Sequence, residues 1–504
     1  MSDTRPNHVV IVGRDAALWL SASVIQRALG PAGISVEAVE LPTRLQPGDI
    51  IVTQPAIEAL HNQLRLDEAA LLRTTGGSFS FGQNFVDSSG ATPSFMHASG
   101  AYGAPIDGNA FFPYWVKARS FGLDVALEDF CLTAAAAKQG RMMLPDETTE
   151  IFGRTDYGYH LPALPYIATL KTLAARLGVV IHHTATVAAE HDQGGIRAIS
   201  LDDGHRIEGA LFVDATGPEA LLIGEALGVG RDEWRPQFGI DRRLSTQAPR
   251  FLSVPAYGEI RAWRDGWLGL YPSQAATHVV QHYSSACCND GDAMRAMATV
   301  SGLSVSGLSV SDATLRTFDP GRRHVAWQGN CVAIGEAACT LDPIHGVDLH
   351  AIQLGLVHLL QLFPVTADFS AERAEYNRLM HSSLERIRDF QSAWYALNRY
   401  GNSPFWTQAR EAARPDALAH KIATFQARGD IAPMEDESFS FDSWQALFVG
   451  LGLMPESWSP AIDRTSPERM KQEFRRILAF VKEQVLKQPT HELYLDNFCR
   501  SEAA

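Results

Sequence analysis

The sequence predicts an α/β protein whose C-terminal part is helical. Three short apolar segments each run into a turn that contains glycine and then into a helical pattern: His8–Gly13, Ala210–Gly217 and Val332–Gly335. After Val365 the apolar spacing becomes helical throughout. A mainly parallel sheet with helices on its faces, followed by a helical region, accounts for both observations.

The length of 504 residues fits one large composite domain or two. We expect an α/β domain over residues 1–365, with substrate-covering insertions at about 75–115 and 240–325, and a helical region over 366–504 packed on it. The predicted C-terminal helices are Ala371–Trp394, Trp406–Ala413, Pro415–Arg428, Asp442–Leu451 and Pro467–Gln488, with a short helix before Cys499.

The composition is that of a soluble globular protein, with 46% apolar and 20% charged residues. A net charge of −14 argues against nucleic acid or an anionic membrane as the main partner. There is no apolar run of about 18 residues and no signal-peptide pattern. The six cysteines show no C-x-x-C pair and no metal-ligand spacing. These features predict a cytoplasmic protein without a bound metal.

The first strand–turn–helix unit has the context of a dinucleotide-binding unit. Strand His8–Val12 is followed by Gly13 and by helix Ala16–Leu29, and the next strand ends at Glu40, whose carboxylate is placed to reach an adenosine ribose. The second and third glycines of the fingerprint are replaced by Asp15 and Leu18. Asp15 adds negative charge where a diphosphate binds, with Arg14 as partial compensation, so we expect weak or absent dinucleotide binding.

The other two strand ends complete the candidate cofactor site. Asp214 and Gly217 end one strand, and Gly335 and Glu336 end the other. In a parallel sheet these residues lie at the same edge as the first turn. The candidate cofactor-binding residues are therefore Gly13, Asp15, Ala16, Glu40, Asp214, Gly217, Gly335 and Glu336. A helix is predicted at about Val347–Leu362.

Between these units the sequence predicts a strand over Arg73–Asp87 and a long loop over Ser88–Pro113. The loop is rich in small residues and carries aromatic side chains, which is typical of a substrate-covering insertion. The candidate substrate residues are Phe95, His97, Tyr102, Phe111 and Phe112. For each ring, a place in a satellite core is an equally good interpretation. Further strands are predicted at Val179–His183, Arg250–Ala262, Trp267–Tyr271 and His278–Tyr283, with a short helix at Leu221–Leu227.

Several motifs together resemble the flavin-dependent tryptophan halogenases. They are Asp214–Gly217 followed by Leu221–Gly228, the segment Trp327–Ala337, the tail Gly450–Pro455 and the late Pro489-Thr490-His491. The resemblance covers nearly the whole chain. It implies a flavoprotein monooxygenase fold, that is, an FAD/NAD(P)-binding Rossmann-like module with a helical pyramid. It also implies FAD supplied in reduced form by a flavin reductase, a lysine that directs hypohalous acid, and an assisting glutamate.

The reactive positions that the resemblance assigns are changed in this chain. The lysine position falls on Ser80, and a hydroxyl cannot form a haloamine or act as a cationic donor. The glutamate and halide-binding positions fall on His345, Gly346, Val347 and Asp348, where Asp348 would repel a halide. The Trp-x-Trp-x-Ile-Pro signature is here Trp267–Pro272 and lacks its second tryptophan.

The changed positions leave three functional hypotheses. The first is a degenerate pseudo-halogenase that binds an aromatic or peptidyl substrate, or a protein partner such as a paralogous halogenase, as a homo- or hetero-oligomer. The second is an FAD-dependent oxidoreductase that acts on an aromatic, indole-type substrate without halide; the third, least favoured, is an active halogenase, which would need the reductase. If one helix placed His345 and Asp348 on one face, they could act as base and orienter. Together with His350 they could also hold a metal. A capped helix start explains the same residues without either role.

Overall fold

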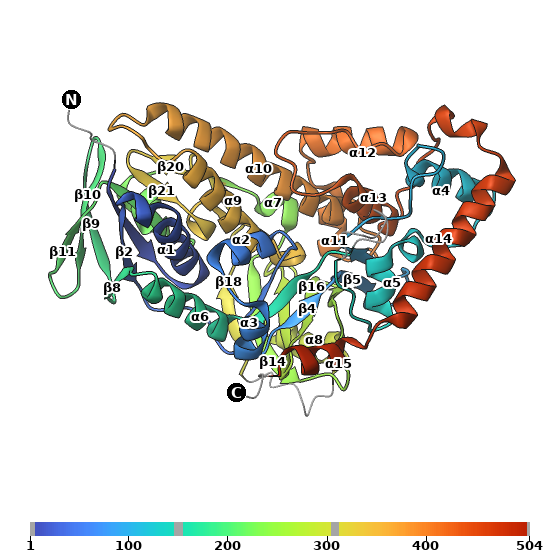
Figure 1. The fold of residues 1–504 in the computed structure, drawn as a ribbon, viewed down its shortest axis with the longest axis horizontal. Coiled ribbons are helices and arrows are strands. Elements are labelled where there is room, and N and C mark those ends of the chain that lie inside the picture. The colour runs from blue at the N-terminus through green and yellow to red at the C-terminus, as the bar shows by residue number, and fades with distance from the viewer. Residues whose placement is uncertain (1–5, 146–154, 304–311, 501–504) are drawn as a thin grey trace. The chain divides into compact units, whose positions relative to one another are not determined.

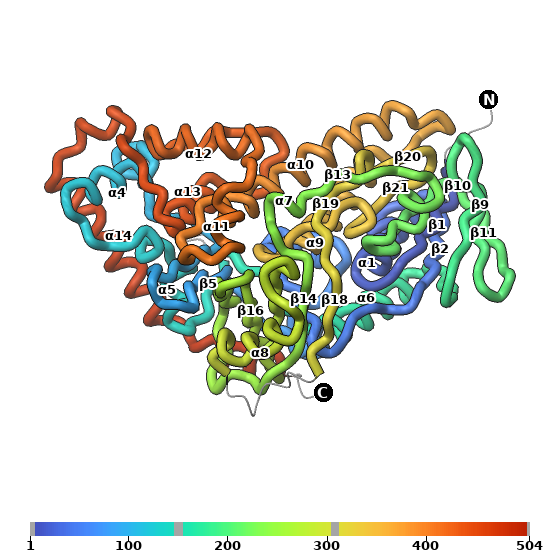
Figure 2. Tube along the Cα trace, turned by 180° about the vertical axis from the view of Figure 1, so that it is seen from behind, coloured from blue at the N-terminus to red at the C-terminus, as the bar shows by residue number. Residues whose placement is uncertain are grey.

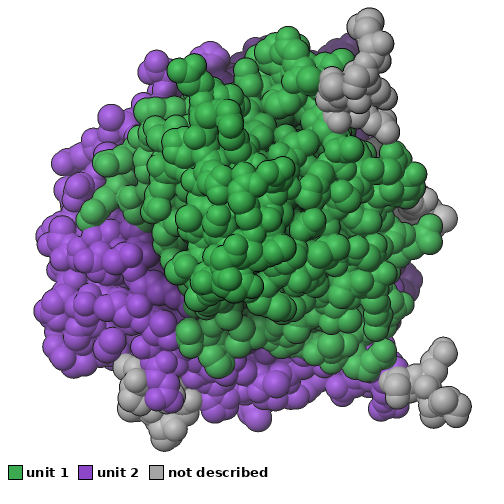
Figure 3. Space-filling model, turned by 90° about the vertical axis from the view of Figure 1, so that its left-hand side faces the viewer, with its two compact units in different colours: residues 1–75, 162–235, 319–388 green, residues 76–161, 236–318, 389–504 purple. Residues whose placement is uncertain are grey.

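The computed structural model describes residues 6–145, 155–303 and 312–500. The chain forms two compact units, shown in different colours in Figure 3. Unit 1 comprises Met1–Thr75, Pro162–Arg235 and Asp319–Arg388, and unit 2 comprises Gly76–Leu161, Pro236–Phe318 and Asp389–Ala504. The predicted division at residue 365 differs from this grouping, because 76–161 and 236–318 build a sheet of their own that belongs with the C-terminal helices.

Unit 1 is built on a six-stranded sheet of order β20-β21-β12-β1-β2-β8. The bounds are β1 His8–Gly13, β2 Ser35–Glu40, β8 Val180–His183, β12 Leu211–Ala215, β20 Trp327–Gln328 and β21 Cys331–Ala333. All neighbours are parallel except β20 and β21. Val9–Val12 of the central strand β1 are wholly buried, as expected for a strand covered on both faces. The predicted Rossmann-like module is therefore present.

Helix α1 (Asp15–Leu29) covers this sheet and packs against α6 (Ala163–Arg176) and α9 (Asp348–Gln361), as Figure 1 shows. Helices α2 (Ile57–Leu64) and α3 (Glu68–Thr75) pack beside them, and strand β3 spans Ile50–Val52. The meander β9 (Val187–Asp192), β10 (Gly195–Leu201) and β11 (Arg206–Glu208) lies beside β2 in Figures 1 and 2. Its hairpin turn contains Gly204 with φ of 83°. A small sheet joins β13 (Arg231–Glu233), β19 (Gly321–Arg323) and β22 (Cys339–Thr340).

Unit 2 contains a seven-stranded sheet of order β18-β14-β17-β16-β15-β5-β6. The bounds are β5 Gly82–Asp87, β6 Phe95–Ala98, β14 Arg242–Pro249, β15 Gly258–Trp263, β16 Gly266–Pro272, β17 Ala276–Tyr283 and β18 Thr314–Thr317. Helix α8 (Asp290–Ser301) packs on this sheet around Leu268, Leu270 and Met297. A separate ladder pairs β4 (Ser78–Ser80) with β7 (Gly158–Pro162).

Helices form the rest of unit 2. They are α4 Phe111–Ser120, α5 Leu132–Lys138, α7 Arg235–Phe238 (begun by the last residue of unit 1), α11 Pro404–Glu411, α12 Asp416–Arg428, α13 Phe441–Gly450, α14 Pro467–Lys487 and α15 His491–Phe498. Helix α10 (Ser370–Ala396) contributes residues to both units. Most predicted C-terminal helices therefore agree with the structure to within two residues.

Four local predictions are corrected by the structure. Arg73–Asp87 is the end of α3 followed by two strands, β4 and β5, which enter different sheets because the chain bends at Gly82 (φ 138°). The loop over Ser88–Pro113 contains strand β6, which pairs with β5, and ends where α4 begins. Only Gly258–Trp263 of the strand predicted at Arg250–Ala262 is extended in the sheet. The helix predicted at Leu221–Leu227 is a short π-type turn over Leu221–Ala226.

Among the described residues, no helix has the combination of length and apolar character that a membrane span requires. The Ser/Gly-rich segment 304–311 and the ends of the chain lie outside the described residues.

Candidate functional site

The first strand–helix turn of unit 1 keeps the backbone of a dinucleotide-binding turn. Gly13 ends β1, and a Cβ at this position would lie 2.2 Å from the main-chain oxygen of Ala215, so β1 and β12 can approach only because residue 13 is glycine. Asp15 has φ of 56°, the left-handed conformation that glycine adopts without strain. Its carboxylate accepts a hydrogen bond of 2.5 Å from Thr43 Oγ1, and Ala16 is buried behind it.

Charged side chains surround this turn. Burial and the nearby charge of Arg44 lower the pKa of Arg14. The carboxylates of Glu219, Asp15 and Glu336 act on that pKa in the opposite direction, so all three lie within electrostatic reach of Arg14. Arg44 is itself ion-paired with Glu219. Three carboxylates and two guanidinium groups therefore lie around this turn, and together these five side chains bring no net positive charge to it.

The carboxylate predicted to hold a ribose is bound by the protein itself. Glu40 ends β2 and accepts a hydrogen bond of 2.6 Å from Lys171 Nζ, and His183 Nδ1 lies 2.7 Å from the same carboxylate oxygen. The Lys171 ammonium also lies 5.5 Å from the centroid of the Trp19 ring. A ribose hydroxyl would have to share or displace these partners.

Asp214 organises the second strand end from within. Its side chain is fully buried and accepts hydrogen bonds from Thr216 N and Oγ1 and from the main-chain N–H groups of Leu222 and Ile223, at 2.7–3.1 Å. Burial raises the pKa of Asp214, and these donors oppose the rise. Gly217 follows with φ of 89°. Asp214 therefore holds the turn in shape.

Gly335 at the third strand end serves the packing of helices. Its φ is 66°, and a Cβ built on it would lie 3.1 Å from Ala17 Cβ and 3.3 Å from Ile352 Cγ1. Glu336 follows in a 3₁₀ turn over Gly335–Ala337. The three strand ends thus meet at one edge of the sheet. Contacts within the protein explain Gly13 and Gly335, and the left-handed backbone explains Gly217.

The structure separates His345 from Asp348. His345 ends a 3₁₀ turn over Pro343–His345 and is 2% exposed, while Asp348 is the exposed first residue of α9. Gly346 between them has φ of 64°, so the two residues do not share one helical face, and the condition for their acting as base and orienter is not met. Burial lowers the pKa of His350 to about 4. Among residues 6–145, 155–303 and 312–500, no group of three or more His, Cys, Asp or Glu is arranged to hold a metal ion.

Ser80 lies in β4 of unit 2. Its side chain is 4% exposed, and its hydroxyl donates to the main-chain oxygen of Gly82 at 3.3 Å. No ammonium group is available at this position, whatever the surrounding structure.

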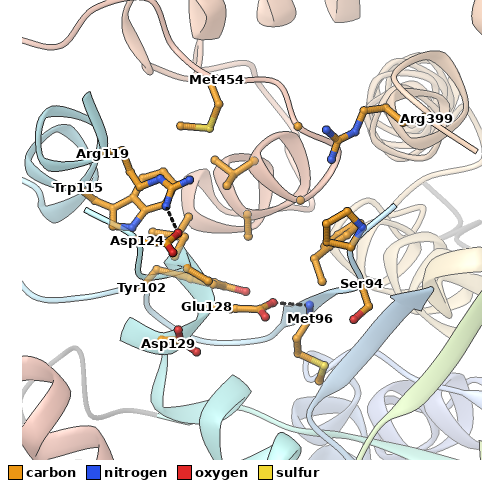
Figure 4. Close-up of a pocket in the computed structure, with 18 residues that line it drawn as sticks. Ser94, Met96, Tyr102, Trp115, Arg119, Asp124, Glu128, Asp129, Arg399 and Met454 are labelled. Carbon is orange, nitrogen blue, oxygen red and sulfur yellow. Dashed lines mark hydrogen bonds and ion pairs between the residues drawn. The ribbon is translucent and has the colours of Figure 1, made fainter. Parts of the chain in front are cut away.

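Unit 2 also contains a cavity of about 550 Å³ (Figure 4). This volume is in the range of small-molecule sites. Aromatic, aliphatic and methionine side chains line it together with charged groups. The lining residues are Pro93, Ser94, Phe95, Met96, Tyr102, Trp115, Arg119, Asp124, Ala126, Leu127, Glu128, Asp129, Arg399, Ala446, Val449, Gly450, Gly452 and Met454.

Two of the predicted substrate residues, Phe95 and Tyr102, line this cavity. Phe95 stacks on Phe85 with ring centroids 5.0 Å apart. The Tyr102 hydroxyl is held by the main-chain N–H and carbonyl of Ala98, at 3.1 and 3.3 Å, which fixes the ring at the cavity wall.

The other three predicted substrate residues lie elsewhere in unit 2. His97 is hydrogen-bonded to the main-chain oxygen of Ser443 at 3.2 Å, and burial lowers its pKa to about 4. Phe111 and Phe112 are about as buried as core residues, at 4% and 5% exposed. Their ring contacts are with Phe130, Phe474, Trp115 and Phe425.

Several lining residues were not predicted as site residues, above all Trp115, Arg399 and Met454. Met454 lies in the tail Gly450–Pro455, one of the motifs that resemble the halogenases. Arg399 follows α10 in the polar segment Asn398–Asn402, and that break between two helices is the one signal in the sequence that points to it.

Comparison with known proteins agrees with the resemblance seen in the motifs. Residues 8–467 match the family described as tryptophan halogenase. Tryptophan 6-halogenase ThaL of Streptomyces albogriseolus is 24% identical over 498 residues, which cover 91% of this chain and 92% of that protein.

Solved structures are similar over the same extent. The flavin-dependent halogenase BrvH from Brevundimonas sp. BAL3 superposes with a TM-score of 0.92 at 30% identity, covering 98% of this chain and 100% of that one. Xcc4156, a flavin-dependent halogenase from Xanthomonas campestris, gives a TM-score of 0.92 at 30% identity, covering 99% and 100%. The predicted resemblance and fold class are confirmed.

Proposed function

Since the chain belongs to the tryptophan halogenase family, we propose that it is a member without halogenating activity that acts by binding an aromatic or peptidyl ligand. The observation that carries this proposal is the serine at position 80, where the resemblance assigns the reactive lysine. Ser80 is buried and its hydroxyl is engaged with Gly82. A hydroxyl has no ammonium to donate and forms no haloamine.

The surroundings of the candidate cofactor site support the same proposal. The negative charge of Asp15, Glu219 and Glu336 opposes a diphosphate, and Glu40 is already paired with Lys171. The position assigned to the assisting glutamate is a buried histidine, His345. Each change removes a different requirement of halogenation.

The cavity of unit 2 supports binding as the remaining activity. It combines the rings of Phe95, Tyr102 and Trp115 with aliphatic and methionine side chains and with five charged groups, so it offers an apolar wall and polar contacts to a small molecule. An aromatic ring, free or as a side chain of a peptide, suits such a wall. A protein partner that delivers or receives this ligand, such as a paralogous halogenase, completes the proposal.

The proposal is tested by activity and binding together. The purified protein is incubated with FAD, NADH, a flavin reductase, bromide and indole, and products are analysed by mass spectrometry, with a working halogenase of the family as positive control. We expect no bromoindole. In parallel, 3-methylindole is titrated by isothermal calorimetry into the wild type and into Ala446→Leu, which narrows the cavity; binding should be lost in the variant while its circular dichroism is unchanged. Bromoindole formation, or equal binding to both proteins, contradicts the proposal.

A second function, an FAD-dependent oxidoreductase acting without halide, is favoured by one observation. Gly13 and Gly217 keep the close strand approach and left-handed turn of a dinucleotide site, and Asp15 keeps a left-handed backbone. Adding FAD, desalting and recording the visible spectrum tests it directly. Retained flavin absorbance, with reductase-dependent oxygen uptake, would favour this function over the first.

A further inference from the structure

The charges that line the cavity of unit 2 are not equivalent. Arg119 is paired with Asp124 at 3.3 Å and donates to the main-chain oxygen of Leu123 at 2.8 Å. Glu128 accepts from the main-chain N–H of Met96 and from Lys138. Arg119 and the lining carboxylates of Asp124, Glu128 and Asp129 are therefore already paired with other groups of the protein.

Arg399 differs from these groups. Within the described part of the chain its side chain makes no hydrogen bond and no ion pair. Figure 4 shows its guanidinium across the cavity from Trp115 and Asp124. It lies directly against the backbone of Gly452, since a Cβ at residue 452 would come within 2.3 Å of Arg399 Cζ. Arg399 is an exposed residue at the cavity wall, so its donors face water and are available to a ligand.

The segment that carries Arg399 is held firmly. The side chain of Asn398 is 3% exposed and donates to the main-chain oxygens of Tyr395 and Trp406 at 2.6 and 3.2 Å. The Thr92 hydroxyl donates to Asp87 Oδ2 at 2.9 Å and also lies 3.2 Å from the main-chain oxygen of Arg399. The backbone next to Arg399 is thus anchored by Asn398, which limits the backbone ordering that ligand binding would require.

We infer that Arg399 selects a ligand that carries a carboxylate on its aromatic body. The guanidinium and a carboxylate match in geometry and charge, and the rings of Phe95, Tyr102 and Trp115 provide the apolar wall. An ammonium group on the ligand would add less to the affinity, because Asp124, Glu128 and Asp129 each already lie beside a cation of the protein. The ligand class is an aromatic carboxylate in which an amino group is not required. This inference rests on the proposed binding function of the same cavity.

The test uses four ligands that share one ring: 3-methylindole, indole-3-propionate, tryptamine and L-tryptophan. Dissociation constants are measured by isothermal calorimetry at fixed ionic strength for the wild type, Arg399→Gln and Arg475→Gln. Arg475 is an exposed arginine of α14 outside the cavity lining and controls for the loss of one positive charge. We expect indole-3-propionate to bind the wild type roughly tenfold more tightly than 3-methylindole, and at least as tightly as L-tryptophan.

In Arg399→Gln the advantage of indole-3-propionate should disappear while 3-methylindole binds as before, and Arg475→Gln should behave as the wild type. Equal binding of the carboxylate and the neutral ligand in the wild type, or a preference that survives Arg399→Gln, overturns the role of Arg399 and leaves the binding function intact. Tightest binding of tryptamine would also overturn it. Failure of all four ligands to bind would remove the proposed binding function together with this inference.

Discussion

The glycine at position 335 allows a direct test of whether the strand-end glycines serve a ligand or the protein's own packing. Gly335→Ala introduces a Cβ 3.1 Å from Ala17 Cβ and 3.3 Å from Ile352 Cγ1. The matched control is Gly228→Ala in the same unit. Gly228 has φ of 69°, against 66° for Gly335, but a Cβ at residue 228 would have nothing within 4 Å.

Both substitutions place alanine in the left-handed region, which costs about 1 kcal/mol. Only Gly335→Ala adds overpacking, which typically costs about 1–3 kcal/mol. The Ala17 methyl cannot rotate away, whereas Ile352 can adjust, so we expect a difference of about 1–2 kcal/mol between the two variants. For a unit of this size that is roughly 2–8 °C in Tm.

Urea unfolding followed by circular dichroism, without added flavin, measures this difference as the separation of the two midpoints. The slopes of the transitions should be the same, since both variants expose the same surface on unfolding. If Gly335→Ala is no less stable than Gly228→Ala, the packing explanation is refuted. The glycine would then be explained by the approach of a ligand, which would favour the FAD-dependent function.

Three further predictions concern stability. Lys421 is 1% exposed and its ammonium lies 2.7 Å from Glu437 Oε2. Lys421→Met leaves this carboxylate unpaired and should lower the free energy of unfolding in urea by about 3–5 kcal/mol. The double variant Lys421→Met/Glu437→Leu should recover most of this loss, and a double variant as unstable as the sum of the single ones would contradict the pairing. Burial raises the pKa of Asp442 from 3.8 to about 6, opposed by the Tyr102 N–H, so this carboxyl lowers stability as the pH rises from 3.8 through 6. Asp442→Asn should therefore be more stable than the wild type by up to about 3 kcal/mol at pH 8 and little different at pH 4, and an equal gain at both values would contradict the cause. Burial lowers the pKa of several histidines from 6.5 to about 4 or about 3. Their contribution to the free energy of unfolding is therefore fully present above pH 6.5 and is lost as the pH falls toward 4. The loss is about 1.4 kcal/mol per pH unit for each histidine that takes up a proton on unfolding. These histidines are His61, His97, His160, His350 and His491. Calorimetry should show a lower Tm at pH 5 than at pH 7.5, and an unchanged Tm would contradict their neutral burial.

Local patterns carried much of the fold. Apolar runs predict the strands that end near Gly13, Gly217 and Gly335, and apolar periodicity with helix-start signals such as Ser466-Pro467 predicts most of the C-terminal helices. These patterns depend on neighbours only a few residues apart. Local sequence patterns do not predict a strand whose existence depends on pairing with another segment. Strand β6 exists because it pairs with β5, and a run of small and aromatic residues does not by itself report that partner.

The sequence alone also determined one chemical fact: a serine at position 80 brings no amine to any fold. Tertiary structure decided which side chains meet. It placed Phe95 and Tyr102 at a cavity and Phe111 and Phe112 in the core, although all four are aromatic. It also joined Lys171 to Glu40 across 131 residues. Such partners are set by the path of the chain through two units of three segments each, and no short stretch of sequence records that path.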